Sequence, residues 1–157
     1  MLSEETRQAI SAVLAQRKEL PGALLPVLHG IQDAVGYIPA QAVEEIAREL
    51  NLSRAEVHGV ITYYHHFRSA PAGRQTVQIC RAEACKSMGA EALWAHARLR
   101  LGCAAHGTTA DGAFTLEPVY CLGLCASSPA IMLGDRLHAR VKPAGFDRLI
   151  EAARGGA

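Results

Sequence analysis

Apolar residues recur at three- and four-residue steps through the first 70 residues, which predicts a series of helices. The first helix would begin at Ser3, whose hydroxyl can cap it. A second is predicted over residues 24–35, with Pro26 in its first turn and Gly36 just after its end. The positions expected to face the interior are Ile10, Val13 and Leu14 in the first helix and Leu24, Leu28, Ile31 and Val35 in the second.

Two further helices are predicted before the pattern changes. Pro39 would open the third, and Ser53 with Glu56 forms a capping box for the fourth. Their inward positions are Val43, Ile46, Ala47 and Leu50 in the third and Val57, Val60, Ile61 and Tyr64 in the fourth. The segment SAPAGR, residues 69–74, has the composition of a linker, so residues 1–70 are expected to form a helical domain.

After residue 74 the pattern favours short strands mixed with helices. TVQIC predicts a strand ending on Cys80, and residues 88–101 predict a helix with Trp94 on its apolar face. Two hairpins are expected, one around Asp111-Gly112 and one around Gly134-Asp135, before a last helix with Phe146, Leu149 and Ile150 inward. Residues 75–157 therefore predict a second, α/β domain whose elements are compatible with a thioredoxin-like sheet.

The amino-acid composition is typical of an ordinary globular protein. The 157 residues are 50% hydrophobic and 20% charged, and the net charge of +1 gives no electrostatic case for nucleic acid. No apolar run approaches the roughly 20 residues of a membrane span, and MLSEETRQAI lacks the plan of a secretory signal. We therefore expect a cytoplasmic protein without direct membrane contact. In that compartment, metal or redox chemistry explains the five cysteines better than disulfides do.

Four of the cysteines form two spaced pairs. Cys80 and Cys85 lie in ICRAEACKSMGA, and Cys121 and Cys125 lie in YCLGLCASSPA. Both pairs fall where predicted strands give way to loops, and strand ends can bring them to one edge of a sheet. Four converging thiolates suit a tetrahedral zinc or an iron–sulfur cluster. The spacings favour iron, because two iron atoms spread the sulfurs further apart than one zinc does.

The residues around the pairs fit a negatively charged cluster. Gly89 and Gly123 allow close turns that leave backbone N–H groups free to point at sulfur. Arg81 and Lys86 would offset the negative charge of four thiolates, with Glu83 partly opposing them.

These cysteine motifs, following GALLPVLHGIQDAVGYIP and VHGVITYYHHF, resemble the thioredoxin-like [2Fe–2S] subunit of NADH-oxidising modules, over about residues 20–150. That family includes subunits of complex I, bidirectional hydrogenases and NAD-dependent formate dehydrogenases. CRAEACKSMGA most resembles the formate dehydrogenase gamma subunit. The resemblance implies a helical bundle before a thioredoxin-like ferredoxin domain.

The resemblance also implies one [2Fe–2S] cluster, with Cys80 and Cys85 on one iron and Cys121 and Cys125 on the other. Its expected partner is a larger flavin- and NAD-binding subunit. In a formate dehydrogenase, electrons would come through that complex from a molybdenum-containing catalytic subunit.

Other interpretations of the cysteines stay open. They could be apolar packing residues, a structural zinc site or the dithiol of an oxidoreductase, although the sequence lacks C-x2-C. Cys103 lies outside both pairs and is interpreted as structural. In YYHHF, Tyr64 is expected to pack, whereas the adjacent His65 and His66 would point apart on a helix, which is poor geometry for a shared metal.

The chain has no phosphate loop, dinucleotide fingerprint or nucleophile elbow. It is therefore expected to be a non-catalytic electron-transfer subunit, with its cluster on the main electron route or acting as a side reservoir. The helical domain is assigned to docking, with simple stabilisation of the cluster domain as the alternative. The alternative to a subunit of a complex is a free-standing ferredoxin or redox sensor, alone or as a homodimer, and the isolated chain could also form a homodimer.

Overall fold

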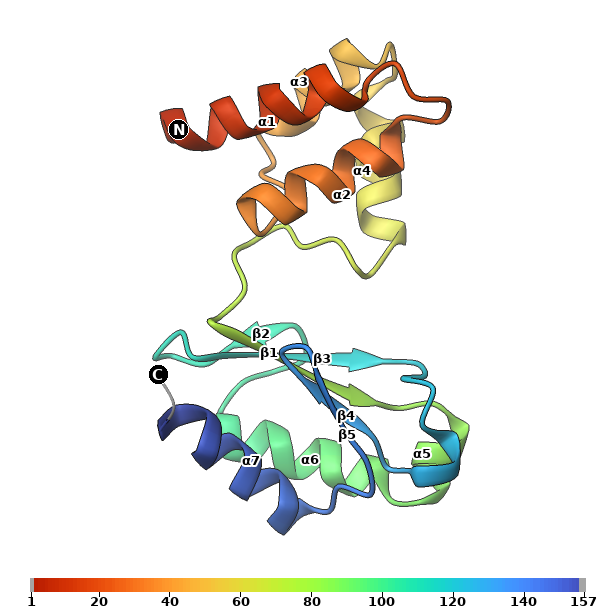
Figure 1. Cartoon of the computed structure of the whole chain (residues 1–157), viewed down its shortest axis with the longest axis vertical. Coiled ribbons are helices and arrows are strands. Elements are labelled where there is room, and N and C mark those ends of the chain that lie inside the picture. Colours follow the sequence, from red (N-terminus) through yellow and green to blue (C-terminus); the bar gives the residue numbers. More distant parts are fainter. Residues whose placement is uncertain (1, 156–157) are drawn as a thin grey trace. The chain divides into compact units, whose positions relative to one another are not determined.

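The computed structural model describes residues 2–155. The chain divides into two compact units, Met1–Pro71 and Ala72–Ala157 (Figure 1). Each unit has a hydrophobic core of its own. None of the helices in residues 2–155 is long and apolar enough to cross a membrane.

The first unit is the predicted helical bundle. Its helices are α1 (Glu4–Arg17), α2 (Leu24–Val35), α3 (Ala42–Glu49) and α4 (Arg54–Tyr63). The four helices surround one buried cluster, whose fully buried members include Ile10, Val27, Leu28, Ile31, Ile46 and Val57.

The predicted caps of α1, α2 and α4 are confirmed. The Ser3 hydroxyl accepts a hydrogen bond from the Thr6 N–H at 3.1 Å, and Ser53 and Glu56 form the reciprocal capping box. Gly36 ends α2 with a left-handed φ of 90°, a conformation that glycine adopts at little cost.

Two expectations in this unit are wrong. The third helix begins at Ala42 and not at Pro39, because the Ala42 N–H bonds to the Pro39 carbonyl in a preceding turn. Tyr64 follows the end of α4 in an extended conformation and is 43% exposed. Phe67 occupies the core in its place, since the chain turns between these two residues.

The second unit is a five-stranded mixed sheet in the order β2-β3-β1-β4-β5. Its elements are β1 (Gln75–Cys80), α5 (Glu83–Ser87), α6 (Ala90–Leu101), β2 (Gly107–Thr108), β3 (Phe114–Val119), the 3-10 helix η1 (Cys125–Ser127), β4 (Ile131–Leu133), β5 (Arg136–His138) and α7 (Pro143–Gly155). β1 and β3 run parallel, while the other neighbouring pairs are antiparallel. Both predicted hairpins, β2–β3 and β4–β5, are confirmed.

Helices α6 and α7 cover one face of this sheet (Figure 1). Trp94 on α6 is 6% exposed and Phe146 on α7 is fully buried, both against strand residues such as Val77 and Leu116. The predicted inward faces of these helices are thus confirmed. Helix α5 is an element that the sequence did not predict, because five residues are too few to show a helical period.

Candidate metal centre

The parallel pairing of β1 and β3 brings the two cysteine pairs to one edge of the sheet. Cys80, the last residue of β1, lies in register with Val119, the last residue of β3, and the chain reaches Cys121 two residues later. The Arg81 N–H donates to the Val119 carbonyl at 2.8 Å, and the Cys80 N–H donates to the Ala130 carbonyl at 3.1 Å. These bonds join the strand end to the segments before and after the second pair.

The first pair is held by regular secondary structure and is buried. Cys80 ends β1 and Cys85 lies within α5, and each is 2% exposed. The sequence placed Cys85 in a loop, which is wrong. The two cysteines pack with Ala90 and Ala130 in a small apolar cluster, so water is largely excluded from this pair.

The thiols of the first pair have opposite tendencies to ionise. Burial opposes ionisation of Cys80, but hydrogen bonds from the Ala82 N–H, the Cys85 thiol and the N–H groups of Leu122 and Cys121 outweigh it, so the pKa of Cys80 lies below its ordinary value. Burial raises the pKa of Cys85, and the neighbouring Cys80 raises it further despite the Ala130 N–H.

The second pair is exposed, with Cys121 in the connection after β3 and Cys125 at the start of η1. The sulfurs of Cys121 and Cys125 are 3.6 Å apart, and both residues are exposed. Two thiolates bound to one tetrahedral metal at about 2.3 Å would lie roughly 3.8 Å apart, so the observed separation fits a shared metal. The hydrogen bond and the charge of Cys121 raise the pKa of the Cys125 thiol.

The backbone of this loop is strained at a ligand candidate. Cys121 has a φ of 106°, which a residue with a Cβ atom seldom adopts, and Gly123 has a φ of 78°. The Gly123 N–H donates to the Cys121 sulfur at 3.4 Å. The glycine thus provides the sulfur-directed N–H group that the sequence predicted, while Cys121 is held in a conformation that costs about 1–3 kcal/mol.

The four sulfurs form two pairs. Besides the causes given above, the charge of Cys125 contributes to the raised pKa of Cys85, and the charge of Cys80 contributes to that of Cys125. In the described residues, no three His, Cys, Asp or Glu side chains are arranged to hold one metal ion. Four thiols in two pairs, with N–H groups directed at sulfur, fit a cluster in which each pair binds one iron.

The cations flanking the first pair are neutralised by carboxylates. Arg81 donates to both Glu91 oxygens, at 3.0 and 2.7 Å, and its guanidinium lies 5.1 Å from the centre of the Trp94 ring. Lys86 lies 3.9 Å from Glu83. Their net effect on a nearby negative charge is therefore smaller than the sequence indicated.

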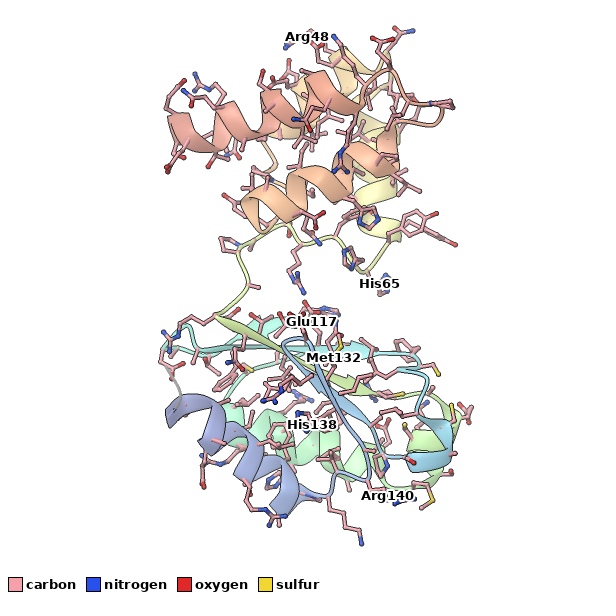
Figure 2. All side chains as sticks on the ribbon, in the orientation of Figure 1. Arg48, His65, Glu117, Met132, His138 and Arg140 are labelled. Carbon is pink, nitrogen blue, oxygen red and sulfur yellow. The ribbon has the colours of Figure 1, made fainter. Side chains whose placement is uncertain are left out.

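The remaining candidates do not join the site. Cys103 packs against the core of the second unit, and burial raises its pKa. His65 and His66 follow α4 in the other unit, and Figure 2 shows His65 in that loop. The His66 ring centre lies 5.0 Å from that of His29. The two histidines are not on a helix, which corrects the prediction, because α4 ends at Tyr63.

A family model described as thioredoxin-like [2Fe-2S] ferredoxin matches residues 10–154, nearly the whole chain. The chain belongs to the thioredoxin-like [2Fe–2S] ferredoxin family. Its cofactor is one [2Fe–2S] cluster, in agreement with the prediction.

Proteins with similar sequences are named as subunits of an NADH-quinone oxidoreductase and of an NADP-reducing hydrogenase. The chain is 36% identical over 148 residues to an NADH-quinone oxidoreductase subunit of Rhizobium meliloti, covering 94% of this chain and 88% of that protein. It is 29% identical over 129 residues to the NADP-reducing hydrogenase subunit HndA of Solidesulfovibrio fructosivorans, covering 82% and 75%.

A solved structure shares the fold. An NAD+-reducing [NiFe]-hydrogenase chain in the H2-reduced state aligns with a TM-score of 0.62 at 21% identity. The alignment covers 99% of this chain but only 23% of that chain. At this identity the likeness bears on the fold alone.

Proposed function

We propose that this ferredoxin is the electron-transfer subunit of an NADH-oxidising complex, with Cys80, Cys85, Cys121 and Cys125 as the cluster ligands. The first two bind one iron and the last two bind the other. Family membership and the pairing of the thiols at one sheet edge support this assignment. The bound cluster would supply one-electron redox chemistry.

The residues around the thiols support such a cluster. The N–H groups of Ala82 and Leu122 approach the Cys80 sulfur and favour its thiolate form, and the Gly123 N–H donates to the Cys121 sulfur. Burial of the first pair lowers the local dielectric, whereas exposure of the second leaves a path for electrons to a partner. The chain therefore has one shielded and one accessible side of the same centre.

The partner we propose is a flavin- and NAD-binding subunit in the cytoplasm, because the relatives are named as subunits of NADH- and NADP-linked enzymes. More specifically, we propose an NAD-dependent formate dehydrogenase whose electrons originate at a molybdenum-containing subunit. The resemblance of CRAEACKSMGA to the gamma subunit of that enzyme supports this choice.

Iron, sulfide and zinc analysis of the anaerobically purified chain, with EPR after dithionite reduction, tests the cluster. A [2Fe–2S] protein gives equal iron and sulfide and a spin-half signal on reduction. Zinc without a signal would contradict the electron-transfer function.

Affinity purification of the full chain tests the complex. A stoichiometric flavoprotein that reduces NAD+ with formate as electron donor supports the formate dehydrogenase assignment. Reduction with hydrogen but not formate would place the subunit in a hydrogenase, and a holo-homodimer without flavin would support a free carrier.

A further inference from the structure

A pocket of about 440 Å³ opens beside the exposed cysteine pair in the second unit. Its lining includes Ala84, Met88, Cys125, Pro129, Arg140 and Lys142. Met88 is 61% exposed although it is a large apolar side chain. Figure 2 shows Arg140 in the connection after β5, near the end of the sheet where α5 and η1 lie. The pocket thus combines apolar walls, two cations and one proposed ligand.

The two cations of this pocket differ from those that flank the first cysteine pair. Arg81 and Lys86 have carboxylate partners within 4 Å. Arg140 and Lys142 are exposed, and neither forms an ion pair with any Asp or Glu in the part of the chain that the structure describes. Their charges are therefore available to an external carboxylate.

The backbone that carries these cations is tied to the cysteine loop. The Arg140 N–H donates to the Ser127 carbonyl at 2.9 Å, and the Val141 N–H donates to the Pro129 carbonyl at 3.0 Å. Arg140 has a φ of 52°, in the left-handed region. The two bonds hold residues 140–142 against the segment that follows Cys125. The two cations are therefore kept beside the exposed cysteine pair.

We propose that this pocket receives a carboxylate-bearing segment of the protein that exchanges electrons with the cluster. The proposal rests on the proposed function and specifies the partner's contact. Unpaired cations attract an acidic segment, and Met88 and Pro129 give it an apolar surface to cover. Docking there would bring the partner next to Cys125 on the accessible side of the centre.

Charge reversal of the pocket tests the proposal. The variant carries Arg140→Glu and Lys142→Glu, and its control carries Arg98→Glu and Arg148→Glu, which are exposed on α6 and α7 outside the pocket. Both variants change the net charge equally. Binding of each holo-protein to the co-purifying flavin subunit is measured by biolayer interferometry at low and high salt.

We expect the pocket variant to raise Kd by about tenfold at low salt, mainly through slower association, and to weaken the salt dependence. The control should stay within about twofold of the wild type. Exchange of the cations, Arg140→Lys with Lys142→Arg, should restore most of the affinity because it keeps both charges.

Iron content and the visible spectrum show whether each variant keeps its cluster. If charge reversal removes iron, the milder Arg140→Gln with Lys142→Gln variant replaces it in the same comparison. A Kd equal to that of the wild type in an iron-replete variant overturns the pocket assignment but leaves the proposed function intact. Failure of the wild type to bind any flavoprotein overturns both.

Discussion

The two cysteine pairs contain the same chemical group in two different settings. Cys80 and Cys85 are buried and held by a strand and a short helix. Cys121 and Cys125 are exposed between the end of β3 and the start of η1, where the backbone is strained at Cys121. We expect packing to keep the first pair in place without a metal, because both cysteines are buried in a small apolar cluster. The second pair depends on local backbone conformation, so it gains most from a ligand that joins both sulfurs. The centre that we propose would thus be supported by tertiary packing on one side and reachable by a partner on the other.

The largest effect that we expect is loss of the cluster when a ligand cysteine is replaced. Comparing the four replacements shows whether the two pairs contribute equally as ligands. Cys80→Ala, Cys85→Ala, Cys121→Ala and Cys125→Ala should each lose most of the bound iron, because one iron would then lack a thiolate. Iron analysis and EPR of the purified variants measure this.

Cys103→Ala is the matched control. Because Cys103 lies outside both pairs, this variant should keep the EPR signal of the cluster. Retention of iron in the two exposed-pair variants alone would mean that the buried pair binds a metal by itself.

A smaller effect concerns the metal-free chain, where exposure should decide thiol reactivity. Cys121 and Cys125 should be alkylated at least about tenfold faster than Cys80 and Cys85, because a reagent must reach the sulfur. The raised pKa of Cys125 means that its own rate should still increase as the pH passes the ordinary thiol range. Peptide mass spectrometry after short exposure to iodoacetamide gives the four rates. Equal rates would show that the buried pair opens readily without its metal.

The strain at Cys121 should be measurable in the metal-free protein. Cys121→Gly should unfold at a higher urea concentration than Cys121→Ala, and its free energy of unfolding should be larger by about 1 kcal/mol. The reason is that glycine adopts a φ of 106° without a Cβ clash. Comparing two variants that both lack the thiol separates the backbone effect from loss of the ligand. Equal stabilities would mean that the loop relaxes when no metal is bound.

The smallest effect concerns the ion pair beside the buried cysteines. The Arg81 guanidinium holds the pKa of the Glu91 carboxyl below its ordinary value. A lowered folded-state pKa stabilises the fold above the pKa of the unfolded chain, and this contribution disappears as the pH falls through the folded-state pKa. Urea unfolding of the metal-free protein should therefore show Glu91→Gln to be slightly less stable at neutral pH and equal to the wild type in acid. A difference that is the same at every pH would assign the effect to packing.

The helices, hairpins and cysteine candidates could be predicted from local patterns. The capping box at Ser53, the turn at Asp111-Gly112 and the spacing of the cysteines each depend on residues a few positions apart. Such signals are short-range, so the sequence alone determines them. The boundary errors at Pro39 and Tyr64 occurred where a turn competes with a helix at its end.

The contacts that distinguish the two cysteine pairs could not be predicted from the sequence and are seen only in the tertiary structure. Parallel pairing of β1 with β3 brings Cys80 close to the segment that leads to Cys121, although two helices and two strands separate the two cysteines along the sequence. Arg81 was predicted to offset the cluster's charge, but it binds Glu91 on α6 instead. Arg140, far along the chain, lines the pocket beside Cys125. Burial and charge depend on which distant residues meet, and that is decided by packing rather than by local sequence.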